Sequence, residues 1–188
     1  MKSRLRDSFG LEEKRDYLVT GEPTTMPDAE KLASEDKFQF QAWALGLVGA
    51  RTATSANRGA DGGIDGRLYF HEGDNKPRQV ILSVKGGHLK ADDIRALGQV
   101  VSREGAEIGV LLTLSEPSQP MRADAASAGF HASPWGQHPR LQILTIRDLL
   151  DGKKIDMQQT AGVNITFKQA PKAAKASGPG QLSLLGDE

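Results

Sequence analysis

The spacing of apolar residues in the first third of the chain predicts a helix with one buried face. Between residues 36 and 48 the apolar positions repeat at i, i+3, i+4, i+7 and i+8. These positions are Phe40, Trp43, Ala44, Leu47 and Val48. Gly49 is expected to end this helix, because glycine readily adopts the backbone conformation found at helix termini. A shorter helix capped by Asp28 is expected just before it, over residues 28–34.

Apolar runs further along the chain predict strands that alternate with helices. The predicted strands cover residues 67–70, 79–84, 108–114 and 141–145. Predicted helices cover residues 94–104 behind an Asp92 cap, 121–128 before Gly129, and 146–150. The run IGVLLTL (residues 108–114) is apolar on both faces and is therefore expected inside the sheet. The fold expected is α/β, a mixed β-sheet flanked by helices, in the order α-β-β-β-α-β or close to it.

The polar ends of the chain define one expected domain between two flanking segments. Residues 1–27 read as a polar N-terminal arm, residues 28–157 as the folded domain and residues 158–188 as a flexible C-terminal tail. The stretch QAPKAAKASGPG in that tail has too few apolar residues to build a core and is expected to be disordered.

Composition excludes several classes of function. The 24 basic residues balance the 24 acidic ones, so any affinity for nucleic acid must come from a local patch. The chain has no cysteine, which excludes thiolate metal sites and cysteine nucleophiles and suits a reducing cytoplasm. We find no secretory signal, membrane-spanning run, P-loop or GxSxG motif. A soluble cytoplasmic protein with no membrane partner is therefore expected.

The segment GADGGIDGRLYFHEGDNKPRQVILSVKGG, residues 59–87, carries the candidate chemistry. If it forms a hairpin with its loop centred between residues 74 and 75, Asp65 lies across from Lys85. Ser83 then shares a face with Lys85, while Val84 points into the core. A carboxylate, a lysine and the Val84 carbonyl beside uncrowded glycines suit Mg²⁺- or Mn²⁺-assisted phosphodiester hydrolysis. The alternative is a surface cross-strand pair, worth under about 1 kcal/mol.

The same residues resemble the catalytic core of Mrr-type restriction endonucleases in the PD-(D/E)xK nuclease superfamily. The resemblance rests on GADGGIDG followed by VILSVKGG, and it continues through IGVLLTL, PMRADAASAG and LQILTIRDLL. It implies a restriction-endonuclease-like fold in which Asp65 binds the metal, Lys85 is the catalytic lysine and Ser83 holds a position usually occupied by Glu or Gln. The chain is also similar to nuclease-like modules attached to some DNA methyltransferases.

Two departures from the family pattern leave three functions open. Ser83 is neutral and short for a metal ligand, and Gln41 stands after Phe40 where many of these enzymes place a glutamate. Asp61 is a candidate second carboxylate. The first function is a metal-dependent DNA endonuclease in restriction or defence. The second is a catalytically weak or inactive DNA-binding module that works with a separate DNA methyltransferase, and a third is an interaction protein without nucleic acid.

Further residues are candidates for binding DNA or partners. Basic residues near the expected site could form a phosphate-binding patch; they are Arg51, Arg58, Arg67, His88 and Lys90. Trp135 is expected to pack over the sheet edge, with stacking on a base as the alternative. The tail sequence QLSLL (Gln181, Leu182, Leu184 and Leu185 are its defining residues) resembles peptides that dock on the replication sliding clamp. Cleavage of both DNA strands would require a homodimer or two visits.

Overall fold

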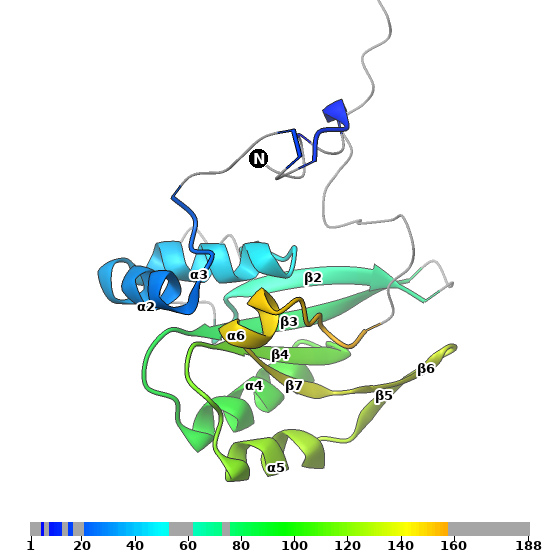
Figure 1. Cartoon of the computed structure of the whole chain (residues 1–188). Helices are drawn as coiled ribbons and strands as arrows, with labels where there is room; N and C mark the ends of the chain where they lie inside the picture. Colours follow the sequence, from blue (N-terminus) through cyan, green and yellow to red (C-terminus); the bar gives the residue numbers. More distant parts are fainter. Residues whose placement is uncertain are drawn as a thin grey trace, which may run out of the picture.

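A computed structural model of the chain shows a five-stranded mixed sheet between two layers of helices (Figure 1). The structure describes residues 21–52, 62–72 and 76–157, together with residues 5, 8–12 and 15–16. The strand order is β1-β2-β3-β4-β7. The strands are β1 Arg51–Thr52, β2 Gly66–His71, β3 Pro77–Lys85, β4 Ile108–Thr113 and β7 Leu141–Thr145. β2 pairs antiparallel with both β1 and β3, whereas β3, β4 and β7 are parallel, as the expected mixed sheet requires.

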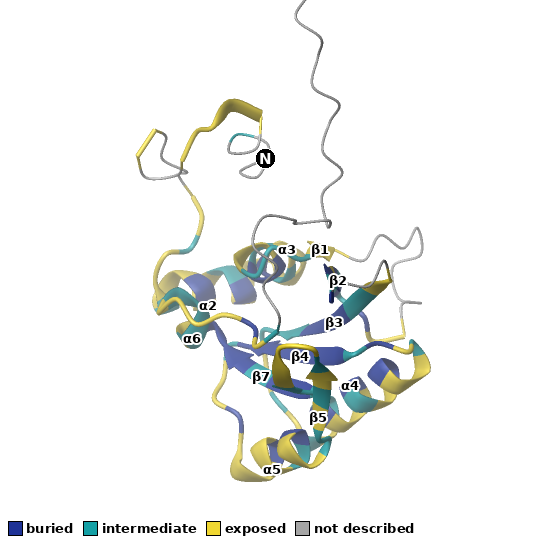
Figure 2. Cartoon of the chain, turned by 90° about the vertical axis from the view of Figure 1, so that its right-hand side faces the viewer, coloured by how far each residue is buried: buried dark blue, intermediate teal, exposed yellow. Residues whose placement is uncertain are grey.

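The helices cover both faces of this sheet. One core contains buried residues from α2 (Met26–Glu35), α3 (Lys37–Leu47) and α6 (Ile146–Leu150), packed on Leu82 and Leu112. A second core contains residues from α4 (Ala91–Arg103) and α5 (Gln119–Ser127), packed on Ile81 and Leu111. Because side chains alternate along a strand, β3 and β4 supply both cores. Figure 2 shows these strands buried between helices whose outer sides are exposed. The expected element order and layer arrangement are confirmed.

Side-chain caps set the helix starts, with two corrections to the sequence analysis. Asp36 accepts hydrogen bonds from the backbone of Phe38 and Gln39 and begins α3, as expected. Thr25, rather than Asp28, is the N-cap of α2. At α4 the capping carboxylate is that of Asp93 rather than Asp92, and it accepts from the backbone N–H of Lys90 at 2.8 Å.

The register of the β2–β3 hairpin differs from the expected one, in which Asp65 lies opposite Lys85. Gly66 pairs with Leu82 and His71 with Pro77, so paired numbers sum to 148. The expected partner of Asp65, Lys85, therefore lies two residues beyond the residue opposite, which is Ser83. β3 continues past the start of β2, and only the backbone N–H of Asp65 extends the pairing, donating to the Leu82 carbonyl at 2.9 Å. On the side that faces β2, the backbone of the last residues of β3 therefore has no strand partner and can bond to side chains instead.

Three surface features were not expected from the sequence. Strands β5 (Phe130–Ser133) and β6 (Gly136–Pro139) form a separate two-stranded sheet in a segment for which the sequence predicted neither helix nor strand. Trp135, at the turn of that sheet, is 61% exposed and does not pack over the sheet edge. Leu47 was assigned to the buried face of its helix but is 40% exposed. Among the described residues, no helix is long and apolar enough to span a membrane.

The two glycines Gly66 and Gly46 give opposite predictions for substitution by alanine. A Cβ on Gly66 would lie 2.5 Å from a Leu45 methyl group and 3.0 Å from the Arg51 carbonyl. We therefore expect Gly66→Ala to lower the free energy of unfolding by about 1–3 kcal/mol. A Cβ on Gly46 meets no atom within 4 Å, and Gly46→Ala should stabilise α3 by up to about 1 kcal/mol. Urea unfolding midpoints measure both, and equal effects of the two substitutions would contradict the packing at Gly66.

Candidate functional site

The carboxylate of Asp65 is the centre of the polar cluster at the open end of the β2–β3 hairpin. The backbone N–H of Val84 donates to its Oδ2 at 2.6 Å, and the Ser83 hydroxyl donates to the same oxygen at 3.2 Å. The Gln41 amide, from α3, donates to Oδ1 at 2.8 Å. The half-buried carboxylate thus accepts three hydrogen bonds, which is the satisfaction that a partly buried charge requires.

Gln41 and Ser83 occupy the two positions at which the resemblance implied acidic or amide side chains. In this structure both act as hydrogen-bond donors to Asp65. A carboxylate at either position would place a second negative charge at hydrogen-bonding distance from the first, a repulsion that proteins tolerate only with a proton or a cation between the groups. With one acid and two neutral donors, the described cluster therefore satisfies the Asp65 carboxylate by hydrogen bonds and contains no second acid beside it. Sequence reasoning named both residues but gave them the role of weak metal ligands.

Lys85 forms its ion pair with Asp93, a residue that sequence reasoning missed as a site residue. Its Nζ lies 3.2 Å from Oδ1 of Asp93, and its side chain is 38% exposed. The other oxygen of Asp93 accepts from the backbone of Lys90, so one carboxylate both caps α4 and holds the lysine. The two adjacent acids at residues 92 and 93 were a signal for the cap, but the sequence did not show that one of them also reaches β3.

The described residues do not fit a divalent-cation site of the kind expected for a nuclease. No group of three or more His, Asp or Glu side chains that could hold a metal ion occurs in the described ranges. Asp65 already accepts three hydrogen bonds, and Val84 contacts it through its N–H rather than presenting its carbonyl to it. The candidate second acid, Asp61, lies outside the described residues. Binding of Mg²⁺ or Mn²⁺ stays a prediction.

The basic residues expected near the site fall into separate groups. Arg67 donates to Gln79 at 2.9 Å and to Glu104 at 2.7 Å, and its hydrogen bond lowers the pKa of the Glu104 carboxyl. Glu104 caps the C-terminal end of α4, whereas the exposed His88 and Lys90 lie at its N-terminal end. By the rise of a helix these ends are about 20 Å apart. Arg51 is exposed on β1, while Arg58 and the QLSLL segment lie outside the described residues.

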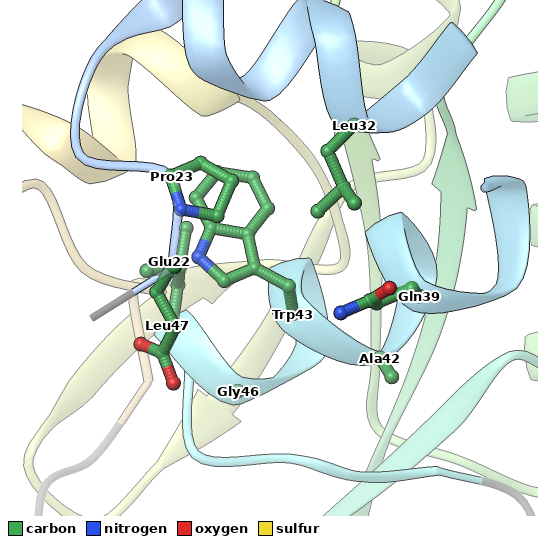
Figure 3. A pocket seen from close by; sticks show the side chains of 9 residues that line it. Glu22, Pro23, Leu32, Gln39, Ala42, Trp43, Gly46 and Leu47 are labelled. Atoms are coloured by element: carbon green, nitrogen blue, oxygen red, sulfur yellow. The ribbon is translucent and has the colours of Figure 1, made fainter. Parts of the chain in front are cut away.

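A hollow lies beside α3, away from the face of the helix that carries Gln41 (Figure 3). Its volume is about 330 Å³, and its walls come from residues 21–23, from Leu32 of α2 and from α3. Trp43 was expected in the core. It is only partly buried against the core, and it also lines this hollow. Helix α3 thus presents Gln41 to the Asp65 cluster and Trp43 to a separate, mainly apolar surface.

Comparison with known proteins gives one match. A family model described as NACHT-associated inactive Restriction Endonuclease 1 matches residues 37–151, which is more than half of the chain. The match begins at α3 and ends directly after α6, so it includes the whole Asp65 cluster. No curated protein and no solved structure matches the chain.

The hydrogen bonds to Asp65 predict a structural cost for its removal. Asp65→Ala leaves the Val84 N–H and the Gln41 amide without their acceptor, and we expect the free energy of unfolding to fall by about 2–4 kcal/mol. Asp92→Ala is the matched control, because that carboxylate is 85% exposed and its ion pair with Arg95 should be worth less than about 1 kcal/mol. Urea unfolding measures both. An unchanged or stabilised Asp65→Ala protein would show that the carboxylate is held there at a cost, as catalytic groups often are.

Proposed function

The chain belongs to the NACHT-associated inactive restriction endonuclease 1 family, and we propose that it is a restriction-endonuclease-like module that binds DNA without cleaving it. The observation that carries this proposal is the state of the Asp65 carboxylate. Its three hydrogen bonds come from Gln41, Ser83 and Val84, so the groups that would share a metal ion in an active site are used to hold one another.

Metal-dependent hydrolysis needs a carboxylate that is free to face the metal, and the described cluster does not supply one. Mg²⁺ requires near-octahedral oxygen ligands and is usually held by one or two carboxylates that are free to face it. Here a cation would have to displace at least one donor from Asp65, and the neutral Ser83 and Gln41 would return little in exchange. The lysine that stabilises charge in such a reaction is also neutralised in part, because Lys85 pairs with Asp93.

Support for DNA binding comes from the fold and from the nitrogen-bearing side chains at this end of the sheet. Lys85 is partly exposed, and His88 and Lys90 are exposed on the loop that follows β3. Such side chains can bind phosphate oxygens whatever the base sequence is, so they favour binding to the DNA backbone over recognition of a particular sequence. We therefore expect weak, salt-dependent binding, with a Kd in the range of about 10⁻⁶–10⁻⁴ M near physiological salt.

A second candidate function is a Mg²⁺- or Mn²⁺-dependent DNA endonuclease of the Mrr type, acting in restriction or defence. Two observations favour it. Asp65 precedes β2 and Lys85 ends β3, so both residues that the resemblance assigns to chemistry lie at the same end of neighbouring strands. Asp61, four residues before Asp65, is a further acid of the same sequence segment.

The partner of the module would supply the activity that the module itself lacks. The family description links such domains to NACHT, so a NACHT protein is the first partner to test. A DNA methyltransferase is the second, on the strength of the sequence resemblance to methyltransferase-attached modules.

Plasmid cleavage separates the two candidate functions. We expect no nicking of supercoiled DNA, methylated or unmethylated, with Mg²⁺ or Mn²⁺, while gel-shift assays show binding that weakens steeply with salt. Lys85→Ala should weaken binding, and Asp92→Ala, as an exposed control, should not. Cleavage that Asp65→Asn and Lys85→Ala both abolish would establish the endonuclease instead.

Restoring the acids should restore metal binding. In the double variant Gln41→Glu/Ser83→Glu, three carboxylates would meet at the Asp65 position, and we expect a lower Tm than that of the native chain without metal. Millimolar Mn²⁺ should raise the Tm of the double variant by linkage and leave the native Tm unchanged. Adding Asp65→Asn to the double variant is the control and should remove most of the shift. An equal Mn²⁺ shift in the native chain would show that the native site already binds metal.

A further inference from the structure

Strands β5 and β6 form an arm that extends beyond the five-stranded sheet (Figure 1). We call residues 130–139 the β5–β6 arm. Its strands pair from Phe130 with Pro139 to Ser133 with Gly136, leaving Pro134 and Trp135 as a two-residue turn. Ser133 stiffens that turn, because its hydroxyl donates to the Gly136 carbonyl at 3.0 Å and accepts from the backbone N–H of Trp135 at 3.3 Å.

Two histidines on one face of the arm attach it to the domain. They are cross-strand partners, so they face the same way. His131 Nε2 lies 2.6 Å from Oε1 of the buried Glu72, whose other oxygen accepts from Arg78. His138 Nδ1 lies 2.8 Å from Oδ1 of Asp156. These contacts fix the orientation of the arm, and with it the direction in which its turn projects.

The opposite face and the turn leave aromatic side chains in solvent. Phe130 is 63% exposed and Trp135 is 61% exposed. Residues 130–140 (FHASPWGQHPR) contain no aspartate or glutamate, and they end in Arg140. A rigid turn therefore holds an indole ring in water, within a segment that carries only neutral and basic side chains. Exposing a large aromatic ring in this way has a cost, which a ligand that stacks on the ring would recover.

We propose that the β5–β6 arm binds single-stranded nucleic acid, with Trp135 stacking on a base and Arg140 contacting the phosphate backbone. This proposal rests on the proposed DNA-binding function and adds a substrate class to it. A base needs only one exposed ring face to stack on, whatever its identity. Residues 130–140 themselves carry no acid, and the two carboxylates that contact the arm, Glu72 and Asp156, pair with His131 and His138 on the face opposite to Phe130. A protein partner is disfavoured because a stable interface buries about 800 Å² on each side, which two four-residue strands alone do not offer.

The arm is a separate site from the Asp65 cluster. It contacts Glu72, directly after β2 ends, whereas Asp65 directly precedes the start of β2. Six residues of strand separate the two positions, a distance of about 20 Å. The arm could therefore hold an unpaired strand while the loop after β3 holds a neighbouring part of the same nucleic acid.

Fluorescence provides a direct test, because the chain has only two tryptophans. In a Trp43→Phe background, Trp135 is the one remaining indole, and we expect its emission to be quenched on titration with oligo-deoxythymidine. In the native background, Trp135→Ala should weaken binding of oligo-deoxythymidine by roughly 5- to 100-fold in fluorescence anisotropy. Trp135→Phe should retain most of the affinity, and a blunt duplex should bind all three proteins equally.

Phe38→Ala is the matched control, since Phe38 is a 72% exposed aromatic on α3, and it should leave the affinity unchanged. An unchanged single-strand affinity in Trp135→Ala, with duplex binding intact, would overturn the role of the arm and leave the proposed function standing. Failure of the native chain to bind either nucleic acid would overturn both. Self-association that Trp135→Ala abolishes, without nucleic-acid binding, would identify the arm as a protein contact and also overturn the proposal.

Discussion

The carboxylate of Asp65 joins three elements that are distant in the sequence. Through Gln41 it holds α3, and through Ser83 and Val84 it holds the end of β3 that extends past β2. In an antiparallel pair, strand residues without a partner must find other acceptors, and Asp65 supplies one to the Val84 N–H in place of a backbone carbonyl. Lys85, the next residue of β3, does not take part in this network and pairs instead with Asp93 of α4.

Much of the fold follows from local sequence signals, because hydrophobic periodicity and caps act over short distances. The Asp36 cap, the α3 helix and the fully buried β4 strand are clear examples. The hairpin register was predicted less well because it depends on where the turn begins, and the turn of GDNK offers several polar positions. The β5–β6 arm was missed because Pro134 and Gly136 read as loop residues, while the contacts that order the arm come from Glu72 and Asp156, far away in the chain.

The candidate site could be located from the sequence but its chemistry could not be settled. The hairpin pattern placed Asp65, Ser83 and Lys85 together, and the family resemblance added Gln41. In the structure Gln41 and Ser83 both donate hydrogen bonds to Asp65. What the sequence left open is the direction of each hydrogen bond and the partner of each charge. An amide or a hydroxyl can bind a metal-bound water or donate a hydrogen bond to a carboxylate, and only the geometry distinguishes these roles.

A site with a single acidic side chain is physically compatible with the proposed binding of DNA. An active nuclease site brings several carboxylates close to a phosphodiester, and a divalent cation must offset their repulsion of the phosphate. With Gln41 and Ser83 as neutral donors, the described cluster retains a single acid whose charge is directed into hydrogen bonds. The phosphate backbone can then approach Lys85, His88 and Lys90 against less repulsion and without a metal ion. In the proposed module, the neutral side chains that disfavour hydrolysis at this position would therefore also remove the main electrostatic reason for a metal requirement in binding.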